Sequence, residues 1–510
     1  MKTRKITLRW KQVVWSCCVL SALALTIPDS LLADPLLAGA SKVDVTDWDA
    51  GPVDGPMHVR ALVLRTGETT AVLITVDSVA IGEIGRISNS YMSRIRKQLK
   101  QEWDIAPTHV LANASHCHGV IRQDIEDLTV QAVREAMQRL EPVHVGVGRG
   151  REDRVMENRR LKLKDGRTVD IRRAYSLPPD EEIAAVGPVD PEIGILRLDR
   201  LDGTTMAIVY NFACHPIQGV PGGRNTADMT GFASQVIEDN LSDGAIALFV
   251  QGCGGDINPA NYKAVDQLLN AESLGNMLGL STLKAARRIQ ITADSRLRIL
   301  HERLALPRAN TQERIMALEA EQTRLLNSLQ GTTLNLKSFM SLVMKYNLAQ
   351  NFPSSHSYRY LQEDALEVDD LRKLDAQNRV AIKSYLANIH VMEELTRLKT
   401  NLRLLKKHQS RFLESGKRTV DVELVGMRIG DFTMVTFPGE LTVQIGLNIK
   451  RSSPHKHTFV AGYTNGYIYY APTADQLLNV GGAQEDSDCV LAPEWQEQFE
   501  RKVAEMLPQL

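Results

Sequence analysis

The sequence of 510 residues is poor in several features that would narrow its class. Aromatic residues make up 5% of it, cysteines number six, and the formal net charge is -1. A near-neutral charge without an arginine-rich, aromatic-containing segment argues against nucleic acid as a partner. So few cysteines in so long a chain exclude a small disulfide-stabilised scaffold. The hydrophobic content of 43% indicates a globular protein with one large domain or two medium ones.

Long apolar runs are also missing, except near the N-terminus. Residues 1–40 begin with the basic segment MKTRKITLRWK, and the apolar run VVWSCCVLSALALTI that follows is short for a bilayer span. Small residues then offer cleavage positions after Ala33 or Ala40. We expect residues 1–40 to be a signal peptide that exports the protein to a periplasm or the extracellular space. A retained N-terminal anchor is the alternative.

The main body of the chain is predicted to be of the α/β class. Between residues 41 and 307, strand-like apolar runs such as ALVLRT, TAVLITVDSVA, HVLANAS, TTMAIVYNFA and AIALFVQG alternate with helical segments. The order is not a strict βαβ repeat, which predicts strands of mixed direction. Residues 416–510 continue with a hairpin around Gly430 and a closing helix. We therefore expect 41–307 and 416–510 to be two parts of one catalytic domain.

Residues 308–415 break this pattern. Leucines recur at three- and seven-residue spacing among charged residues, as in QERIMALEAEQTR and EELTRLKTNLRLLKK. This spacing predicts long amphipathic helices in an antiparallel hairpin, with NFPSSHSYRY as the connecting loop. The simplest interpretation is an inserted structural arm. Binding of a protein partner, oligomerisation and peripheral membrane contact remain open alternatives.

The segment NASHCHG follows a strand-like run and contains two histidines. If the strand continues, His116 and His118 point to one side and Cys117 to the other. An H-x-H pair at a strand end is a recurrent way to place two imidazoles near one metal. Two buried, hydrogen-bonded histidines are the alternative. A second pair, His455 and His457, lies in the polar stretch SSPHKH and is typical of a surface.

Other polar residues also end apolar runs. His215 ends the apolar run in NFACHPIQG, and Glu440 follows the apolar run before TFPGE. Glu440 could be a metal ligand, a general base or a first-turn helix residue. In FVQGCGGDINP, Gly254 and Gly255 permit close approach of the backbone, and their N–H groups could bind an oxyanion. Asp256 follows directly after these glycines. A tight turn between strand and helix is the simpler interpretation of this segment.

The order of these segments is more specific than any one of them. NASHCHG, ENRR, NFACHP, GCGGDINP, FPGE and NGYIYYAPT resemble the motifs of the neutral, or non-lysosomal, ceramidase family. That family carries N-A-T-H-T-H-S-G-P, N-R-S, V-H-P, G-D-V-S-P-N, P-G-E and N-x-Y-x-x-Y-x-T-T in the same order. The resemblance runs from about residue 43 to 507, interrupted by 308–415. It implies two stacked, twisted mixed β-sheets flanked by helices, with the long helical hairpin arm inserted.

The resemblance also implies a zinc site. The family holds Zn²⁺ with the first histidine of H-x-H, the histidine before proline, the glutamate of P-G-E and a tyrosine. In this sequence these are His116, His215, Glu440 and a tyrosine, for which we choose Tyr467 over Tyr470. Nitrogen and oxygen ligands with one open position suit a catalytic zinc rather than a structural one.

Further site residues follow from the same motifs. His118 is expected beside the metal, for proton transfer or substrate contact, and Arg159 matches the substrate-facing arginine of N-R-S. The candidate catalytic residues are thus His118, Arg159 and Asp256. The candidate substrate-binding residues are Asn113, Gly254, Gly255 and Tyr470.

One departure from the family affects the expected chemistry. The segment QGCGGDINP lacks the family's active-site serine, and Gly252 or Asn258 stands in its place. Water is then the expected nucleophile. The resemblance implies an exported zinc-dependent hydrolase, an amidase acting on a small-molecule or lipid N-acyl substrate. A non-catalytic binding protein that contacts a partner through the helical arm is the alternative, although it would not need to keep every inferred metal ligand.

Overall fold

The computed structural model describes residues 34–170, 178, 180–241, 244–263, 270–348, 358–479 and 483–510. Most of the expected leader, with the cleavage position at Ala33, lies outside these residues. Strand β1 (Leu37–Asp44) pairs along its whole length with β2 (His58–Thr66), and Ala40 is buried within it. Cleavage after Ala40 would remove half of a core strand. The expected boundary at residue 40 is therefore wrong, and the folded body begins before Leu37.

A nine-stranded sheet forms the larger layer. Strands β3 (Thr69–Val76) and β4 (Val110–Ala114) extend it beyond β2 on one side. On the other side of β1 it continues through β5 (Glu141–Arg151), β10 (Glu192–Arg200), β11 (Thr205–Phe212) and β12 (Ile246–Gln251), with β14 (Ile291–Thr292) beside β5. The β3–β4 and β11–β12 pairs are parallel and the others antiparallel, which confirms the mixed strand directions.

A four-stranded sheet stacks on the first. Its order is β15 (Leu297–Pro307), β16 (Thr419–Ile429), β17 (Phe432–Thr436) and β19 (His457–Ala461). The predicted hairpin joins β16 and β17 at Gly430, whose φ is +55°. Leu196 and Val209 of the larger sheet share one buried cluster with Met427 and Phe459 of the smaller one. The stacked pair of sheets is thus confirmed.

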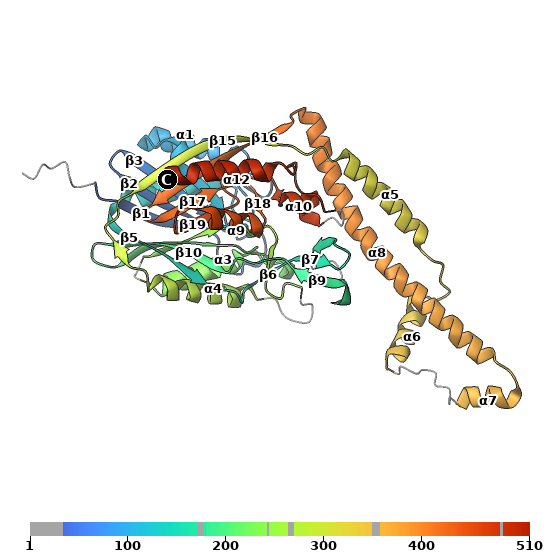
Figure 1. The fold of residues 1–510 in the computed structure, drawn as a ribbon. Coiled ribbons are helices and arrows are strands. Elements are labelled where there is room, and N and C mark those ends of the chain that lie inside the picture. The colour runs from blue at the N-terminus through green and yellow to red at the C-terminus, as the bar shows by residue number, and fades with distance from the viewer. Residues whose placement is uncertain are drawn as a thin grey trace, which may run out of the picture.

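Helices cover the outer faces of the two sheets (Figure 1). The larger sheet packs against α1 (Tyr91–Trp103), α2 (Ile125–Gln138), α3 (Asp228–Asp239) and α4 (Ala271–Ala286). The smaller sheet packs against α9 (Val443–Ser452) and α12 (Trp495–Met506). Each helix buries residues at helical spacing, such as Tyr91, Ile95 and Leu99 of α1, which is why these amphipathic sequences form helices here.

Short elements fill the edge where the strands end. They are β6 (Met156–Asn158) with β13 (Ile257–Pro259), β18 (Glu440–Leu441) with β20 (Tyr470–Ala471), and β8 (Thr168–Asp170) with β7 (Arg160–Leu163) and β9 (Ile183–Val186). Helices α10 (Ala474–Leu477) and α11 (Gln484–Ser487) lie in the same part of the chain.

A helical arm projects from the body between β15 and β16 (Figure 1). It comprises α5 (Gln312–Ser328), α6 (Leu336–Leu348), α7 (Tyr358–Leu366) and the 46-residue α8 (Asp370–Ser415). At 1.5 Å per residue, α8 is about 69 Å long. Helices α5 and α8 pack against each other and confirm the expected hairpin, and the shorter α6 and α7 contact α8 farther from the body. Most of the expected loop NFPSSHSYRY lies outside the described residues, and its last three residues begin α7.

No helix in the described ranges is both long enough and apolar enough to cross a bilayer.

The two ends of the larger sheet meet at Asn113. Its Nδ2 donates to the Gly462 carbonyl at 2.7 Å and to the Thr464 hydroxyl at 3.0 Å. Its Oδ1 accepts the backbone N–H of Gln251 at 2.9 Å. This buried side chain ties β4 and β12 to the segment after β19. Asn113 was expected to bind substrate, but these contacts engage its side chain with Gly462, Thr464 and Gln251.

We expect Asn113→Ala to lower the free energy of unfolding by about 2–4 kcal/mol, because it removes three buried hydrogen bonds. The control is Asn240→Ala, which removes one exposed hydrogen bond at the end of α3 and should cost less than about 1 kcal/mol. Denaturant unfolding followed by circular dichroism would measure both. Equal losses in the two variants would contradict the role given to Asn113.

Candidate metal centre

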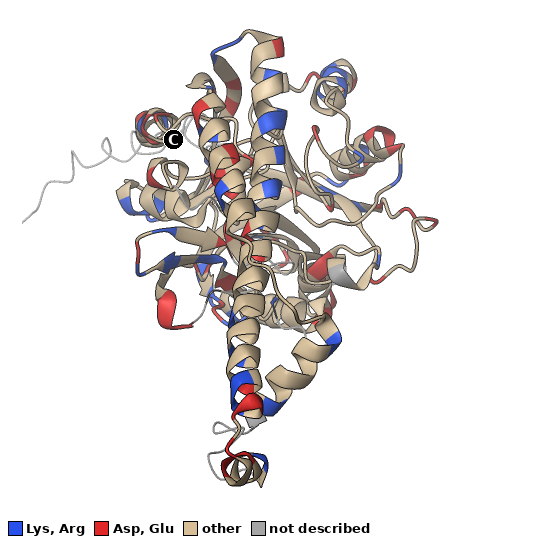
Figure 2. Ribbon diagram, turned by 90° about the vertical axis from the view of Figure 1, so that its right-hand side faces the viewer, with Lys and Arg blue, Asp and Glu red and all other residues tan. Residues whose placement is uncertain are grey.

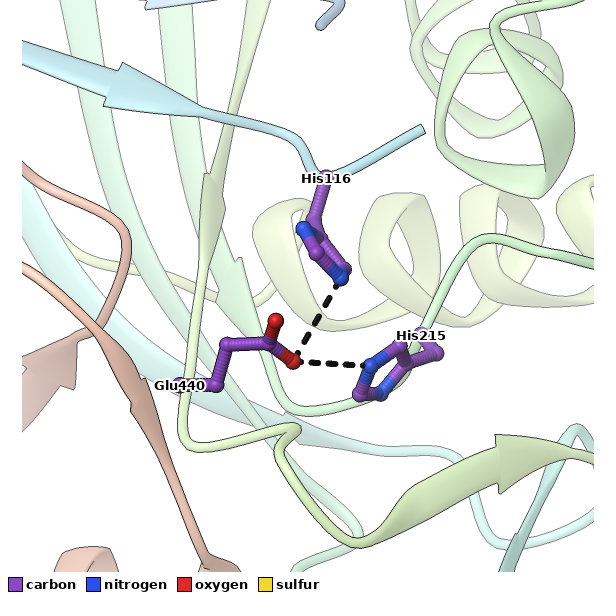
Figure 3. A group of neighbouring side chains, drawn as sticks. All are labelled: His116, His215 and Glu440. Carbon is purple, nitrogen blue, oxygen red and sulfur yellow. Dashed lines mark hydrogen bonds and ion pairs between the residues drawn. The ribbon is translucent and has the colours of Figure 1, made fainter. Parts of the chain in front are cut away.

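Three buried side chains meet at the edge where β4 and β11 end and β18 begins. His116, His215 and Glu440 are each 2% exposed, and their ligand atoms lie within 4.8 Å of one another (Figure 3). The structure thus brings together three of the four residues expected to bind a metal. A set of this kind could hold a metal ion.

Backbone contacts fix the orientation of His116. Its N–H donates to the Ser78 carbonyl at 2.9 Å, and its ring Nδ1 lies 2.6 Å from the Val79 carbonyl. A carbonyl oxygen only accepts hydrogen bonds, so Nδ1 must carry the proton of the neutral ring. Nε2 then has a free lone pair that could bind a metal. Nε2 faces Glu440 Oε2 at 3.5 Å.

The strand does not continue through NASHCHG as expected. It ends at Ala114, and His116 has a left-handed φ of +68°. The alternation of side chains therefore does not explain why the two histidines are neighbours, although their rings lie 5.2 Å apart. Cys117 is buried in the core, whereas His118 is exposed beside the buried site. The surrounding protein removes part of the water around His118 and so lowers its pKa, and the nearby His116 lowers it further.

His215 is held in the same manner from the other strand. Its Nδ1 lies 2.5 Å from the Gly254 carbonyl and 3.2 Å from that of Ile257. Its Nε2 lies 3.0 Å from Glu440 Oε2. Both imidazoles therefore turn the same nitrogen toward one carboxylate oxygen. A backbone carbonyl behind a metal-binding histidine is the usual second contact that fixes the ring.

The charges of this group favour a bound cation. Burial lowers the pKa of His116 to about 4 and also lowers that of His215, so both rings are neutral. Burial opposes ionisation of the Glu440 carboxyl, whereas the hydrogen bond that it accepts from the Tyr467 hydroxyl lowers its pKa. Two lone pairs then face an ionised carboxylate without a positive charge between them. A divalent cation resolves this repulsion, and the nitrogen and oxygen donors fit Zn²⁺.

Two tyrosines complete the surroundings of Glu440. The Tyr463 hydroxyl donates to Oε2 at 3.1 Å, and the Tyr467 hydroxyl donates to Oε1. The Tyr463 ring also lies 4.3 Å from the ring of His116. Sequence reasoning missed Tyr463, although it too follows the apolar run HTFVAG. Tyr467, the expected fourth ligand, reaches the site through Glu440.

Arg159 and Tyr470 lie on the far side of His215. The Arg159 guanidinium donates to the Gly255 carbonyl at 2.5 Å and to the Tyr470 hydroxyl at 3.1 Å, and its Nε lies 2.6 Å from Glu485. The Tyr470 ring stacks on His215 with centroids 6.4 Å apart. Burial opposes the charge of Arg159, but Glu485 holds the pKa of its guanidinium well above the usual value.

The glycine segment serves packing rather than anion binding. The Gly254 N–H donates to the Gly252 carbonyl at 3.0 Å, and the Gly255 N–H donates to Leu441 at 2.9 Å. Neither N–H is available to an oxyanion, which corrects that expectation. The close approach is confirmed at Gly255, where a Cβ would lie 2.6 Å from the Glu440 carbonyl oxygen.

Asp256 supports the helix that follows Glu440. Its Oδ1 accepts the N–H of Val443, the first residue of α9, at 2.8 Å. Its Oδ2 accepts from Asn158 at 3.3 Å and lies 4.0 Å from Arg160 Nε. Burial raises the pKa of this carboxyl. These contacts explain Asp256 as a structural residue and give no support to the catalytic role expected for it.

Both positions that stand in place of the expected serine are engaged in local contacts. A Cβ at Gly252 would lie 3.0 Å from the Phe212 carbonyl oxygen, closer than nearly all real contacts. The Asn258 side-chain oxygen accepts a hydrogen bond from Arg159 at 3.3 Å. Neither position therefore offers a hydroxyl.

Comparison with known proteins supports the fold. No protein-family model matches the sequence, and no curated protein shows a significant match. A neutral ceramidase from Pseudomonas aeruginosa matches in structure with a TM-score of 0.57 and 15% identity, over 93% of this chain and 74% of that one. A ceramidase complexed with C2 matches with a TM-score of 0.59 and 15% identity, over 93% and 75%.

The chain has the neutral ceramidase fold. The resemblance drawn from the order of six short motifs is thereby confirmed at the level of the fold.

We expect His116→Ala and His215→Ala each to lose bound zinc, because each removes one of two nitrogen ligands. The control is His457→Ala, which changes the second H-x-H pair, away from this centre. Metal content after dialysis against zinc should be about one ion per chain in the wild type and the control. Zinc retained at that level in both site variants would rule out this centre.

Proposed function

We propose that the protein is an exported zinc-dependent hydrolase that cleaves the linear amide bond of an N-acyl lipid of the ceramide type. The observation that carries this proposal is the buried group of His116, His215 and Glu440 at the strand-end edge of a neutral ceramidase fold. The ceramidases with this fold make a lipid amide the best-supported substrate. Export rests on the composition of the first 40 residues.

The metal would be held by four side chains. His116 and His215 would bind through Nε2 and Glu440 through its carboxylate, and we assign Tyr467 as the fourth ligand. When bound, zinc polarises a carbonyl and lowers the pKa of a water molecule to about 7. The backbone contacts to both Nδ1 atoms keep the two rings in the required tautomer before any metal arrives.

His118 is the proposed general base and acid. It is the exposed imidazole next to the buried His116, and its lowered pKa keeps it neutral and able to accept a proton. It would take one proton from the attacking water as the oxygen bonds to the amide carbon. It would return that proton to the nitrogen as the C–N bond breaks. The products are a free carboxylic acid and an amine.

Water fits as the nucleophile because Gly252 and Asn258 bring no hydroxyl to the site. Arg159 and Tyr470 form the wall beside His215, and we assign them to substrate contact. The missing serine also supports a second candidate, a ceramidase-like protein that binds lipid without cleaving it. The exposed His118 favours the hydrolase, since a binding protein needs no proton carrier at this place.

We expect His118→Gln to reduce amide hydrolysis by about 10²-fold or more while about one zinc per chain remains bound. The assay would use a short-chain ceramide and detect the released fatty acid by mass spectrometry. Removing zinc with a chelator should abolish turnover, and adding zinc should restore it. Release of no acid by the zinc-loaded wild type would favour the binding protein. Full activity in His118→Gln would contradict the role given to this residue.

A further inference from the structure

The far end of the arm carries large apolar side chains on its surface. On α6 and α7 these are more than half exposed, with values from 53% to 74%. They are Leu336, Met340, Met344, Tyr358, Leu361 and Leu366. Side chains of this type are normally buried, and an exposed cluster of them marks an interaction surface.

The apolar residues of α6 form one outward stripe. Leu336, Met340 and Met344 follow one another at four-residue spacing and so share a face of the helix. On another face, Phe339 is buried against Tyr385 of α8, with ring centroids 4.0 Å apart. This stack anchors the helix and leaves the stripe turned outward.

The charges around the stripe favour a lipid surface as its partner. Lys337 and Lys345 flank it, and residues 329–348 contain no Asp or Glu. On α7, Glu363 accepts the N–H of Leu371 and Asp364 pairs with Arg372 at 2.7 Å, so these acids are engaged with α8. An apolar stripe with lysines beside it is the pattern of a helix that lies in a membrane interface. A second copy of α6 would bring like charges together.

We propose that the tip of the arm, α6 and α7, docks on a bilayer that contains anionic lipids. The apolar stripe would enter the interface, and the lysines would lie at the head groups. Delivery of a membrane lipid to the metal centre rests on the proposed function, but the docking itself does not.

The test compares two double variants of the full chain. Met340→Asp with Met344→Asp changes the stripe, and Met316→Asp with Leu413→Asp changes equally exposed residues of α5 and of the end of α8 near the body. We expect the first variant to bind vesicles of phosphatidylcholine and phosphatidylglycerol about tenfold more weakly in sedimentation, and the second to bind like the wild type. All four side chains are on the surface, so both variants should fold.

Wild-type protein that stays in the supernatant, or equal binding by both variants, would overturn the proposal. If the wild type is a dimer and only the first variant is a monomer, the docking proposal is overturned and the tip is assigned to self-association. An assay of the hydrolysis of a soluble short-chain ceramide tests the proposed function without a membrane, and so separates it from the docking proposal. Vesicle binding without hydrolysis would contradict the function alone, and hydrolysis without vesicle binding would contradict docking alone.

A different set of contacts joins the base of the arm to the metal centre. Tyr469 has a left-handed φ of +67°, and its carbonyl accepts the Glu440 N–H at 2.9 Å. The C-terminal part of α8, where basic residues gather (Figure 2), holds the side chain of Tyr469. His408 packs against its ring at 4.7 Å, and Arg411 donates to its hydroxyl at 2.6 Å. Its hydroxyl in turn donates to Glu83 at 3.2 Å.

The other arm helix reaches the same region. Arg314 of α5 donates to the Asp486 carbonyl at 2.9 Å, and the Asp486 carboxylate pairs with Arg160 at 2.6 Å. The neighbouring Glu485 pairs with Arg159 of the site wall. Both arm helices therefore support segments that surround the candidate metal ligands.

We infer that Arg411 is a positioning residue for Glu440, acting through Tyr469. Arg411→Ala should weaken zinc binding about tenfold, as measured by competition with a chromophoric chelator, because loss of such outer contacts loosens the ligands. Arg411→Lys should recover part of the affinity. Arg403→Ala, an exposed arginine of the same helix, is the control and should bind zinc normally. Unchanged affinity in Arg411→Ala, with an unchanged circular dichroism spectrum, would overturn this inference.

Discussion

The structure of the site depends on one buried carboxylate. Glu440 is ionised and almost inaccessible, and two imidazole lone pairs face one of its oxygens. A buried charge is costly unless it is paired. The hydroxyls of Tyr463 and Tyr467 supply hydrogen bonds but no positive charge. A cation bound between these side chains would pair with the charge of Glu440, and three separate chain segments converge to form this candidate site.

Backbone geometry holds these segments in place more than side-chain packing does. The carbonyls of Val79 and Gly254 determine which nitrogen of each histidine turns inward. Asn113 joins the strand ends, and the absence of a side chain at Gly255 lets the loop after β12 touch the backbone of Glu440. The same glycine segment, which is tightly packed at Gly252, thus allows the candidate metal ligands to meet. The close packing at Gly252 and the close approach at Gly255 are thus two features of one tightly packed turn.

Sequence reasoning could find His116, His215 and Glu440 because each ends an apolar run, and strand ends gather at one edge of a sheet. The stacked sheets could be predicted for a similar reason, since strand patterns and family motifs agree. The left-handed backbone at His116 could not be predicted from the sequence. The same is true of the N–H groups of Gly254 and Gly255, which donate to carbonyls within the chain. These depend on which distant carbonyl lies within reach, and no local pattern records that. Tyr463 was missed because a tyrosine after an apolar run is also an ordinary core residue.

The arm shows how an insertion can join a site without disturbing the sheet that bears it. Strands β15 and β16 pair as far as Pro307 and Thr419, so the arm replaces what would otherwise be a hairpin turn. A long insertion at such a turn adds little loop-closure entropy. Within α8, every buried residue lies between Leu398 and Gln409, in the part near the body. The half toward the tip gains no burial from the body, because its apolar residues are at most partly covered. The base is therefore a fixed part of the surroundings of the candidate metal centre, whereas the tip is stabilised chiefly by contacts within the arm. This division leaves the base of the arm in contact with the candidate site and the apolar side chains of the tip exposed.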